Sequence, residues 1–267
     1  RESVRKSLVM LKNSNATLPI KIARKVLVAG DGANSIPKQI GGWTKARQGR
    51  EATNEDFPNA TSIYAGLKRA IEATGGSVEL AKKDQWERKP DVAIVIFGEN
   101  PYAKETGDLE HLAFKDPDRT NAALLSKLQI DGVPIVSVFL TGRPLFLNHV
   151  IQQSDAFVVA WLPGTEGGGI ADVLVADRSG KPKFDFVGKL PFPWPNASVN
   201  KYHSDLPVSS HLFNRGYGLN YSSIVDEIGV ALPEENYDLD DKPMLIFKGT
   251  PLSPFSSYVG DSRNWSL

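Results

Sequence analysis

The chain has 267 residues, of which 41% are hydrophobic and 23% are charged, a composition typical of a folded protein rather than a disordered one. Its 31 Lys and Arg residues balance 31 Asp and Glu residues, so the basic excess of a nucleic-acid binder is missing and we predict no nucleic-acid partner. The absence of cysteine excludes disulfides, thiol nucleophiles and cysteine-ligated zinc sites. No apolar run approaches the ~20 residues of a membrane-spanning helix, so we predict no membrane span.

Short apolar runs and helical patterns alternate along most of the chain. It starts at Arg1 without an initiator Met or a signal-peptide layout, which we interpret as the start of a fragment. A helix is predicted from Glu2, because Val4, Leu8 and Leu11 share one face. Strands are then predicted at 25–29, 77–80, 91–97, 134–140 and 156–161, and helices at 62–74 and 121–130. This order predicts an α/β fold with a parallel sheet covered by helices.

The pattern weakens after about Tyr221, where the sequence becomes rich in Asp, Glu and Pro. A domain boundary is therefore expected between residues 222 and 240. The segment that follows is too short to bury a core of its own, so it either packs onto the main domain or begins another module.

Loops at the carboxyl ends of parallel strands are the expected place for a binding site. One such loop, Gly30-Asp31-Gly32, invites a dinucleotide-binding interpretation. Ser35 replaces the third glycine of that motif and Asp31 would repel phosphate, so a tight strand-to-loop turn is favoured. The glycine-rich loop at 164–169 lacks the Gly-Lys-Ser/Thr ending of a P-loop, and a close approach of helix to sheet explains it better.

Two other loops carry groups suited to sugar chemistry. The loop at 98–108 holds Glu99, Tyr102, Lys104, Glu105 and Asp108, so it contains either a general acid or a solvated set of salt bridges. In a second, glycine-opened loop at 41–44, a tryptophan is either a stacking surface for a sugar ring or a core anchor. The four histidines lack metal-binding spacing, and no serine-nucleophile elbow is present, so we expect no metal and no cofactor.

Eight collinear segments resemble the second half of glycoside hydrolase family 3. They include Gly41-Gly42-Trp43-Thr44 and Gly98-Glu99-Asn100-Pro101-Tyr102, and the full set is 4–13, 28–33, 41–44, 98–103, 139–145, 161–168, 188–195 and 216–221. The resemblance covers roughly residues 2 to 224 and is greatest to exo-acting β-glucosidases and β-glucan exohydrolases. It implies an α/β sandwich domain over 1–224, with a six-stranded, mostly parallel sheet, and a linker and the start of a possible β-rich module over 225–267.

The resemblance also implies a partner and half of a catalytic apparatus. In this family a (β/α)8 barrel supplies an aspartate nucleophile in a Ser-Asp-Trp motif, which this chain lacks, and the sandwich supplies the acid/base glutamate and part of an aromatic clamp. A retaining mechanism requires both carboxyl groups, ~5 to 5.5 Å apart. We therefore expect the chain alone to be inactive and a barrel of the same enzyme to be its partner.

Two departures from the family pattern affect the expected site. The family's acid/base occupies the seventh position of the loop that starts at Gly98, where this sequence has Lys104, and Glu105 follows one residue late. Either a register shift brings Glu105 to the glycosidic oxygen, or the site is degenerate. Where the family commonly has a second tryptophan, four residues after Trp43, this sequence has Arg47, so one face of the clamp is lost or replaced by a guanidinium platform.

Our functional hypothesis is the C-terminal domain of a retaining exo-β-glycosidase that removes terminal β-D-glucosyl residues from β-glucans or β-gluco-oligosaccharides. Glu105 is the catalytic candidate, and the substrate-binding candidates are Trp43, Arg47, Glu99, Tyr102 and Lys104. By resemblance, the location is periplasmic or secreted. The alternatives are a non-catalytic carbohydrate-binding or structural module with a degenerate active-site loop and, less favoured, a Rossmann-like nucleotide binder.

Overall fold

The computed structural model describes residues 1–82, 85–109, 111–116, 120–196, 211–223, 259–260 and 265–266. The chain divides into two compact units, Arg1–Glu234 and Glu235–Leu267. In the second unit, β9 (Val259–Gly260) pairs antiparallel with β10 (Trp265–Ser266). The rest of the expected linker and module at 225–267 lies outside the described residues, so that expectation stays a prediction.

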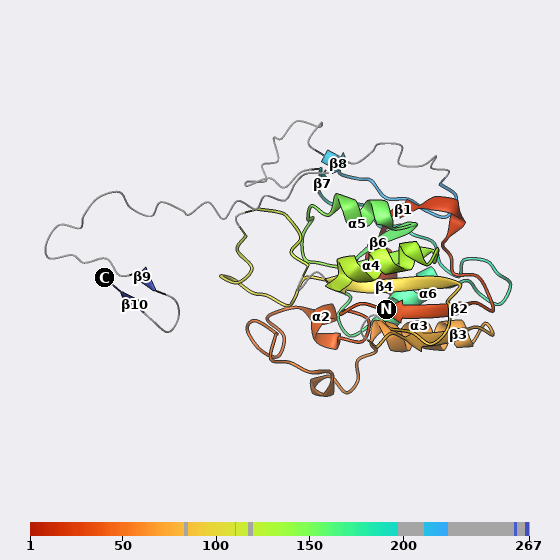
Figure 1. Cartoon of the computed structure of the whole chain (residues 1–267), viewed down its shortest axis with the longest axis horizontal. Helices are drawn as coiled ribbons and strands as arrows, with labels where there is room; N and C mark the ends of the chain where they lie inside the picture. Colours follow the sequence, from red (N-terminus) through yellow and green to blue (C-terminus); the bar gives the residue numbers. More distant parts are fainter. Residues whose placement is uncertain are drawn as a thin grey trace, which may run out of the picture. The chain divides into compact units, whose positions relative to one another are not determined.

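The first unit is built on a mixed sheet of six strands among the described residues (Figure 1). The strand order is β1-β6-β5-β4-β2-β3, and only β1 is antiparallel to its neighbour. The strands are β1 (Val9–Asn13), β2 (Lys25–Ala29), β3 (Ser77–Leu80), β4 (Val92–Gly98), β5 (Ile135–Leu140) and β6 (Ala156–Trp161). The predicted α/β class and the six-stranded, mostly parallel sheet are confirmed.

Helices cover both faces of this sheet. They are α1 (Glu2–Ser7), α2 (Ile36–Ile40), α3 (Ile63–Glu72), α4 (Thr120–Ile130), α5 (Asn148–Gln153) and α6 (Gly168–Leu174), with 3-10 turns at Ser14–Ala16 and Asn54–Asp56. Alternate residues of β4 serve two separate cores: Ile94 and Ile96 pack with α1, α3 and α6, and Val95 and Phe97 pack with α4 and α5. A short hairpin, β7 (Trp194–Pro195) with β8 (His211–Phe213), joins the second core. Because β4 is buried on both faces, its sequence is a continuous apolar run rather than an alternating one.

The start of the chain differs from the prediction. The helix expected from Val4 to Leu11 ends at Ser7, and residues 9–13 form β1 at the edge of the sheet. The reason is that Met10 enters one core while Val9 and Leu11 enter the other, which requires the alternation of a strand. Three apolar residues at helical spacing therefore gave the wrong period.

The glycine-rich loop at 164–169 does permit a close approach, but between helices rather than between helix and sheet. A Cβ built on Gly66 of α3 would lie 2.5 Å from the Cα atom of Gly168 in α6, and one built on Gly169 would meet the side chain of Val4 in α1. The glycines therefore let the backbones of α3 and α6 touch directly and leave room on α6 for the Val4 side chain of α1.

The sheet also creates a topological switch point. From β2 the chain moves outward to β3, and it then returns to β4 on the other side of β2 before continuing to β5 and β6. The carboxyl ends of β2 and β4 lie side by side at this point, and the loops after them carry most of the candidate residues. Among the described residues, no helix combines the length and hydrophobicity needed to cross a membrane.

The turn after β2 offers a matched test of steric constraint. Gly30 has a φ of +91°, and a Cβ there would lie 2.2 Å from the carbonyl oxygen of Ile96, whereas Gly132 has a φ of +63° and open space around it. We expect Gly30→Ala to lower the free energy of unfolding by at least about 3 kcal/mol and Gly132→Ala by about 1 to 2 kcal/mol. Urea denaturation measures both, and equal losses would contradict the close approach.

Candidate active site

An ion pair between a buried lysine and a partly exposed aspartate lies at the switch point. The Nζ atom of Lys38, in α2, lies 2.6 Å from Oδ2 of Asp31 in the turn after β2 and donates to the carbonyl oxygen of Gly98 at 3.0 Å. Its side chain is only 8% exposed. Burial raises the pKa of the Asp31 carboxyl, and the charge of Lys38 opposes that rise. The crevice that holds a cofactor in other doubly wound folds is thus occupied by the chain itself, which supports the tight-turn interpretation of Gly30-Asp31-Gly32.

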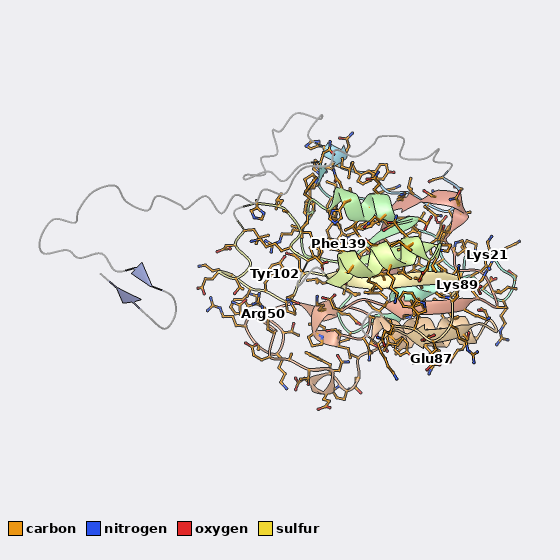
Figure 2. The ribbon with its side chains drawn as sticks, viewed as in Figure 1. Lys21, Arg50, Glu87, Lys89, Tyr102 and Phe139 are labelled. Carbon is orange, nitrogen blue, oxygen red and sulfur yellow. The ribbon has the colours of Figure 1, made fainter. Side chains whose placement is uncertain are left out.

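Two loops, at 41–50 and 99–109, pack directly against each other beside this ion pair. A Cβ built on Gly42 would lie 2.2 Å from the carbonyl oxygen of Tyr102, so this contact requires glycine. The guanidinium of Arg50 donates from Nε to the carbonyl oxygen of Pro101 at 3.1 Å. Figure 2 shows Arg50 and Tyr102 near each other at one end of the sheet.

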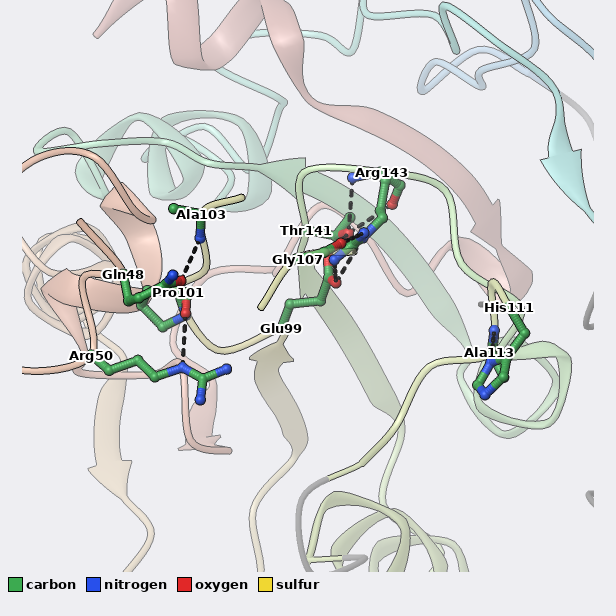
Figure 3. Close-up of polar contacts among 10 residues, drawn as sticks. All are labelled: Gln48, Arg50, Glu99, Pro101, Ala103, Gly107, His111, Ala113, Thr141 and Arg143. Atoms are coloured by element: carbon green, nitrogen blue, oxygen red, sulfur yellow. Dashed lines mark hydrogen bonds and ion pairs between the residues drawn. The ribbon is translucent and has the colours of Figure 1, made fainter. Parts of the chain in front are cut away.

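The Gln48 side chain links the two loops next to the candidate acid/base residues. Its Oε1 atom accepts a hydrogen bond from the backbone N–H of Ala103 at 2.8 Å, as Figure 3 shows, and its Nε2 atom donates to the carbonyl oxygen of Lys104 at 3.3 Å. Gln48 therefore fixes the backbone on both sides of the peptide between Ala103 and Lys104. That peptide leads into the two candidates for the acid/base position, Lys104 and Glu105.

Three predicted site residues come together across these loops. Nη2 of Arg47 lies 2.8 Å from Oε1 of Glu105, and the Arg47 guanidinium carbon lies 5.8 Å from the centre of the Trp43 ring. The backbone N–H of Trp43 donates to the carbonyl oxygen of Arg47 at 3.0 Å, which closes the turn between them. Trp43 is 68% exposed, so the core-anchor interpretation is wrong and the ring is free to stack.

The backbone presents Glu105 at the tip of a tight turn. Its φ is +80°, a left-handed conformation that costs energy for any residue with a Cβ. The N–H of Asp108 donates to the Glu105 carbonyl at 3.1 Å, the N–H of Gly107 donates to the Ala103 carbonyl at 2.8 Å, and Oδ2 of Asp108 accepts from the Glu105 N–H at 3.3 Å. The Glu105 side chain is 68% exposed.

Glu99 and Tyr102 belong to a different cluster. The Glu99 carboxylate accepts from Thr141 Oγ1 at 2.7 Å and from Arg143 Nε at 2.9 Å, and it is only 13% exposed. Arg143 also donates to the carbonyl of Gly107 (Figure 3). Its guanidinium carbon lies 4.2 Å from the centre of the Tyr102 ring. Burial first, and then the charge of Glu99, raise the pKa of the Tyr102 hydroxyl. The contacts of this cluster are those of a brace that holds the loop onto β5.

Sequence reasoning did not identify Lys38, Gln48 or Thr141. Each acts through hydrogen bonds or an ion pair to a segment distant in sequence, and no local motif signals such a contact. Among the described residues there is no group of three His, Asp or Glu side chains that could hold a metal ion.

The switch-point ion pair is testable by charge removal. Asp31→Asn leaves the buried Lys38 ammonium without a counter-charge, and because Asp31 is partly exposed to solvent we expect the free energy of unfolding to fall by about 1 to 2 kcal/mol. The double variant Lys38→Met with Asp31→Asn removes both charges and is expected to recover at least half of that loss. Urea denaturation at pH 7 measures both, and a single variant as stable as the wild type would refute the role of the pair.

The Gln48 link predicts a local effect on loop 99–109. In Gln48→Ala the Ala103 N–H loses its acceptor, so its hydrogen exchange is expected to speed up on the order of ten-fold, equivalent to about 1.4 kcal/mol. The exposed Gln152 provides the control variant Gln152→Ala, which leaves that exchange rate unchanged. NMR-detected hydrogen exchange at residue level measures these rates. An unaltered exchange rate of the Ala103 N–H in Gln48→Ala would show that its hydrogen bond to Gln48 does not stabilise the loop.

Comparison with known proteins gives these loops a context. The model of the glycosyl hydrolase family 3 C-terminal domain matches residues 8–221. The chain is 30% identical over 243 residues to a lysosomal beta glucosidase of Dictyostelium discoideum, covering 81% of this chain and 28% of that relative. It is 29% identical over 290 residues to a periplasmic beta-glucosidase of Salmonella typhimurium, covering 89% of this chain and 36% of that relative.

A solved structure agrees in both sequence and fold. The crystal structure of an exo-1,3/1,4-beta-glucanase from a Pseudoalteromonas species has a TM-score of 0.80 and 48% sequence identity, over 88% of this chain and 29% of that one. The chain thus spans about a third or less of the length of the Dictyostelium glucosidase and of this glucanase. These matches confirm the resemblance drawn from the eight motifs: the chain belongs to glycosyl hydrolase family 3 and comprises its C-terminal domain.

Proposed function

We propose that this chain is the sandwich domain of a retaining exo-β-glycosidase that removes terminal β-D-glucosyl residues from β-glucans or β-gluco-oligosaccharides. The observation that carries the proposal is the placement of Glu105, whose exposed carboxylate lies beside Arg47 and Trp43 at the carboxyl end of the sheet. The 48% identity to an exo-1,3/1,4-beta-glucanase supports the substrate class.

Glu105 is the proposed acid/base residue. It protonates the glycosidic oxygen as the bond breaks and then removes a proton from the attacking water. The nucleophilic carboxylate comes from a barrel domain, which is the proposed partner. Because Arg47 holds Glu105 in the free domain, substrate must exchange that contact for one with the glycosidic oxygen.

Trp43 and Arg47 form the proposed wall for the sugar on the leaving-group side. The exposed indole offers a flat apolar face for a pyranose ring, and the guanidinium beside it donates hydrogen bonds to hydroxyl groups. Lys104 precedes Glu105 and adds a cation at the same loop tip. Glu99 and Tyr102, which were substrate-binding candidates, are proposed to act through the loop brace instead.

The proposed location is periplasmic or secreted. It rests on the relatives, one of which is described as periplasmic and another as lysosomal, and both compartments lie outside the cytosol.

A specific observation also favours the alternative of a non-catalytic carbohydrate-binding module. Glu105 is held in an ion pair, and the family's acid/base position carries Lys104. In that case Trp43 and Arg47 bind sugar, and no protonation follows.

Leaving-group dependence distinguishes the two functions. In the complete, barrel-containing enzyme, Glu105→Gln is expected to reduce kcat/KM on laminari- and cello-oligosaccharides by about 10² to 10⁴, because their leaving groups require a proton. An activated aryl β-glucoside hardly needs protonation and is expected to lose much less. Steady-state kinetics on both substrates provide the measurement.

Two further variants complete this test. Glu72→Gln, on the exposed end of α3, controls for loss of a surface carboxylate and is expected to leave both substrates unaffected. Lys104→Gln tests the alternative that Lys104, which occupies the family's acid/base position, acts in place of Glu105. If Glu105→Gln leaves both substrates unchanged, the assignment fails and Glu99 is tested next; an enzyme inert on every β-glycoside supports the binding module.

A further inference from the structure

An open cavity of about 250 Å³ lies beside the loop that carries Glu105, and Tyr102, Thr106 and Leu109 of that loop line it. None of Trp43, Arg47 and Glu105 lines it, so it is separate from the proposed glycosidase site. Its charged walls are Arg50, Lys115, Arg143 and Glu99, three cations and one carboxylate. Since Arg143 and Glu99 neutralise each other at 2.8 Å, the positive charge of the other two residues is left over among the described residues of the lining.

Arg50 is held in place, and within the described ranges it forms no ion pair. Its Nε atom donates to the Pro101 carbonyl, while its two terminal nitrogens have no acceptor among the described residues (Figure 3). The bond to Pro101 orients the guanidinium without using its terminal N–H groups. A guanidinium fixed in this way is suited to bind a planar or tetrahedral oxyanion through two parallel hydrogen bonds.

Lys115 provides a second cation at the same cavity. Within the part of the chain that the structure describes, no carboxylate lies within ion-pair distance of its ammonium. The neighbouring Asp116 accepts hydrogen bonds from Asn121 Nδ2 at 2.6 Å and from the Ala122 N–H at 2.9 Å, so its carboxylate is engaged at the start of α4. Two cations from loops distant in sequence therefore meet one cavity.

The remaining walls are suited to a sugar ring. Tyr102, Leu109 and Leu145 supply aromatic and apolar surface, and Asn100 and Thr106 supply hydrogen-bonding side chains. The volume lies just below the range of drug-sized pockets, which matches a single sugar unit better than an oligosaccharide.

We propose that this cavity binds one sugar unit that carries an oxyanion, either the carboxylate of a uronic acid or a sulfate ester. Arg50 and Lys115 bind the oxyanion, and Tyr102 and Leu109 contact the ring. The site is accessory to hydrolysis and does not depend on whether Glu105 is catalytic. Its ligand bridges loop 41–50 to the end of loop 99–109, so occupancy stabilises the arrangement of both loops.

Calorimetric titration of the full chain with four probes tests the proposal at constant ionic strength. D-glucuronate and D-glucose 6-sulfate are expected to bind at least ten-fold more tightly than D-glucose. The ratio of their two dissociation constants identifies the preferred oxyanion. Inorganic sulfate is the fourth probe. Because none of the probes contains a glycosidic bond, the result is independent of the proposed hydrolysis.

Charge-removal variants locate the site. Arg50→Gln and Lys115→Gln are each expected to weaken binding of the better charged sugar by at least five-fold, and Arg50→Lys to restore part of the affinity. Lys89→Gln, at the opposite end of the sheet in Figure 2, is the matched control and leaves affinity unchanged. Thermal unfolding verifies that every variant is folded.

Three results would overturn the inference. One is that glucose binds as tightly as the charged sugars or that no probe binds at about 20 mM, on the order of the weakest affinities worth assigning. The second is that both Gln variants bind like the wild type. The third is that inorganic sulfate binds as tightly as the sugars, which would identify an adventitious ion only.

Discussion

The contact between Lys38, Asp31 and the carbonyl of Gly98 holds together the end of the sheet on which the site is built. It joins the turn after β2, the helix α2 and the last residue of β4, three segments that the chain brings together only at the switch point. The lysine is buried and the aspartate is partly exposed, so removing the carboxylate leaves a buried ammonium with the Gly98 carbonyl as its remaining partner. The loop that follows α2 starts from a helix that this pair has already fixed, and the loop that follows β4 starts from its acceptor.

From this anchor, the site is assembled by contacts to the backbone of the facing loop rather than by a cluster of titratable groups. Gly42 allows one loop to lie directly on the other, and Gln48 and Arg50 then bind three peptide groups of the facing loop. The carboxylate that the sequence suggests as an acid is placed by this arrangement, while Glu99, the other carboxylate of the loop, is committed to Arg143. One loop thus carries a structural carboxylate at its start and an exposed one at its tip.

Much of this fold is accessible from the sequence, because buried parallel strands are continuous apolar runs and their order determines the class. Prediction failed at β1, where the same three leucine and valine positions satisfy a helical period until the two cores on either side of the sheet are known. At the site, the motifs identified Trp43, Arg47 and Glu105, which the structure brings together. They could not identify Lys38 or Gln48, because a side chain that binds the backbone of a distant loop leaves no periodic or compositional trace.

Trp43 and Glu105 share one further property: both have a left-handed backbone, with φ values of 60° and 80°. Glycine at either position would relieve a strain on the order of 1 kcal/mol, so a chain selected for stability alone would carry glycine at both. Each position instead bears a large, exposed side chain that adds almost nothing to the core. Stability and side-chain chemistry therefore oppose each other at these two loop tips, and a search for thermostable variants that ignores function would remove the indole and the carboxylate first.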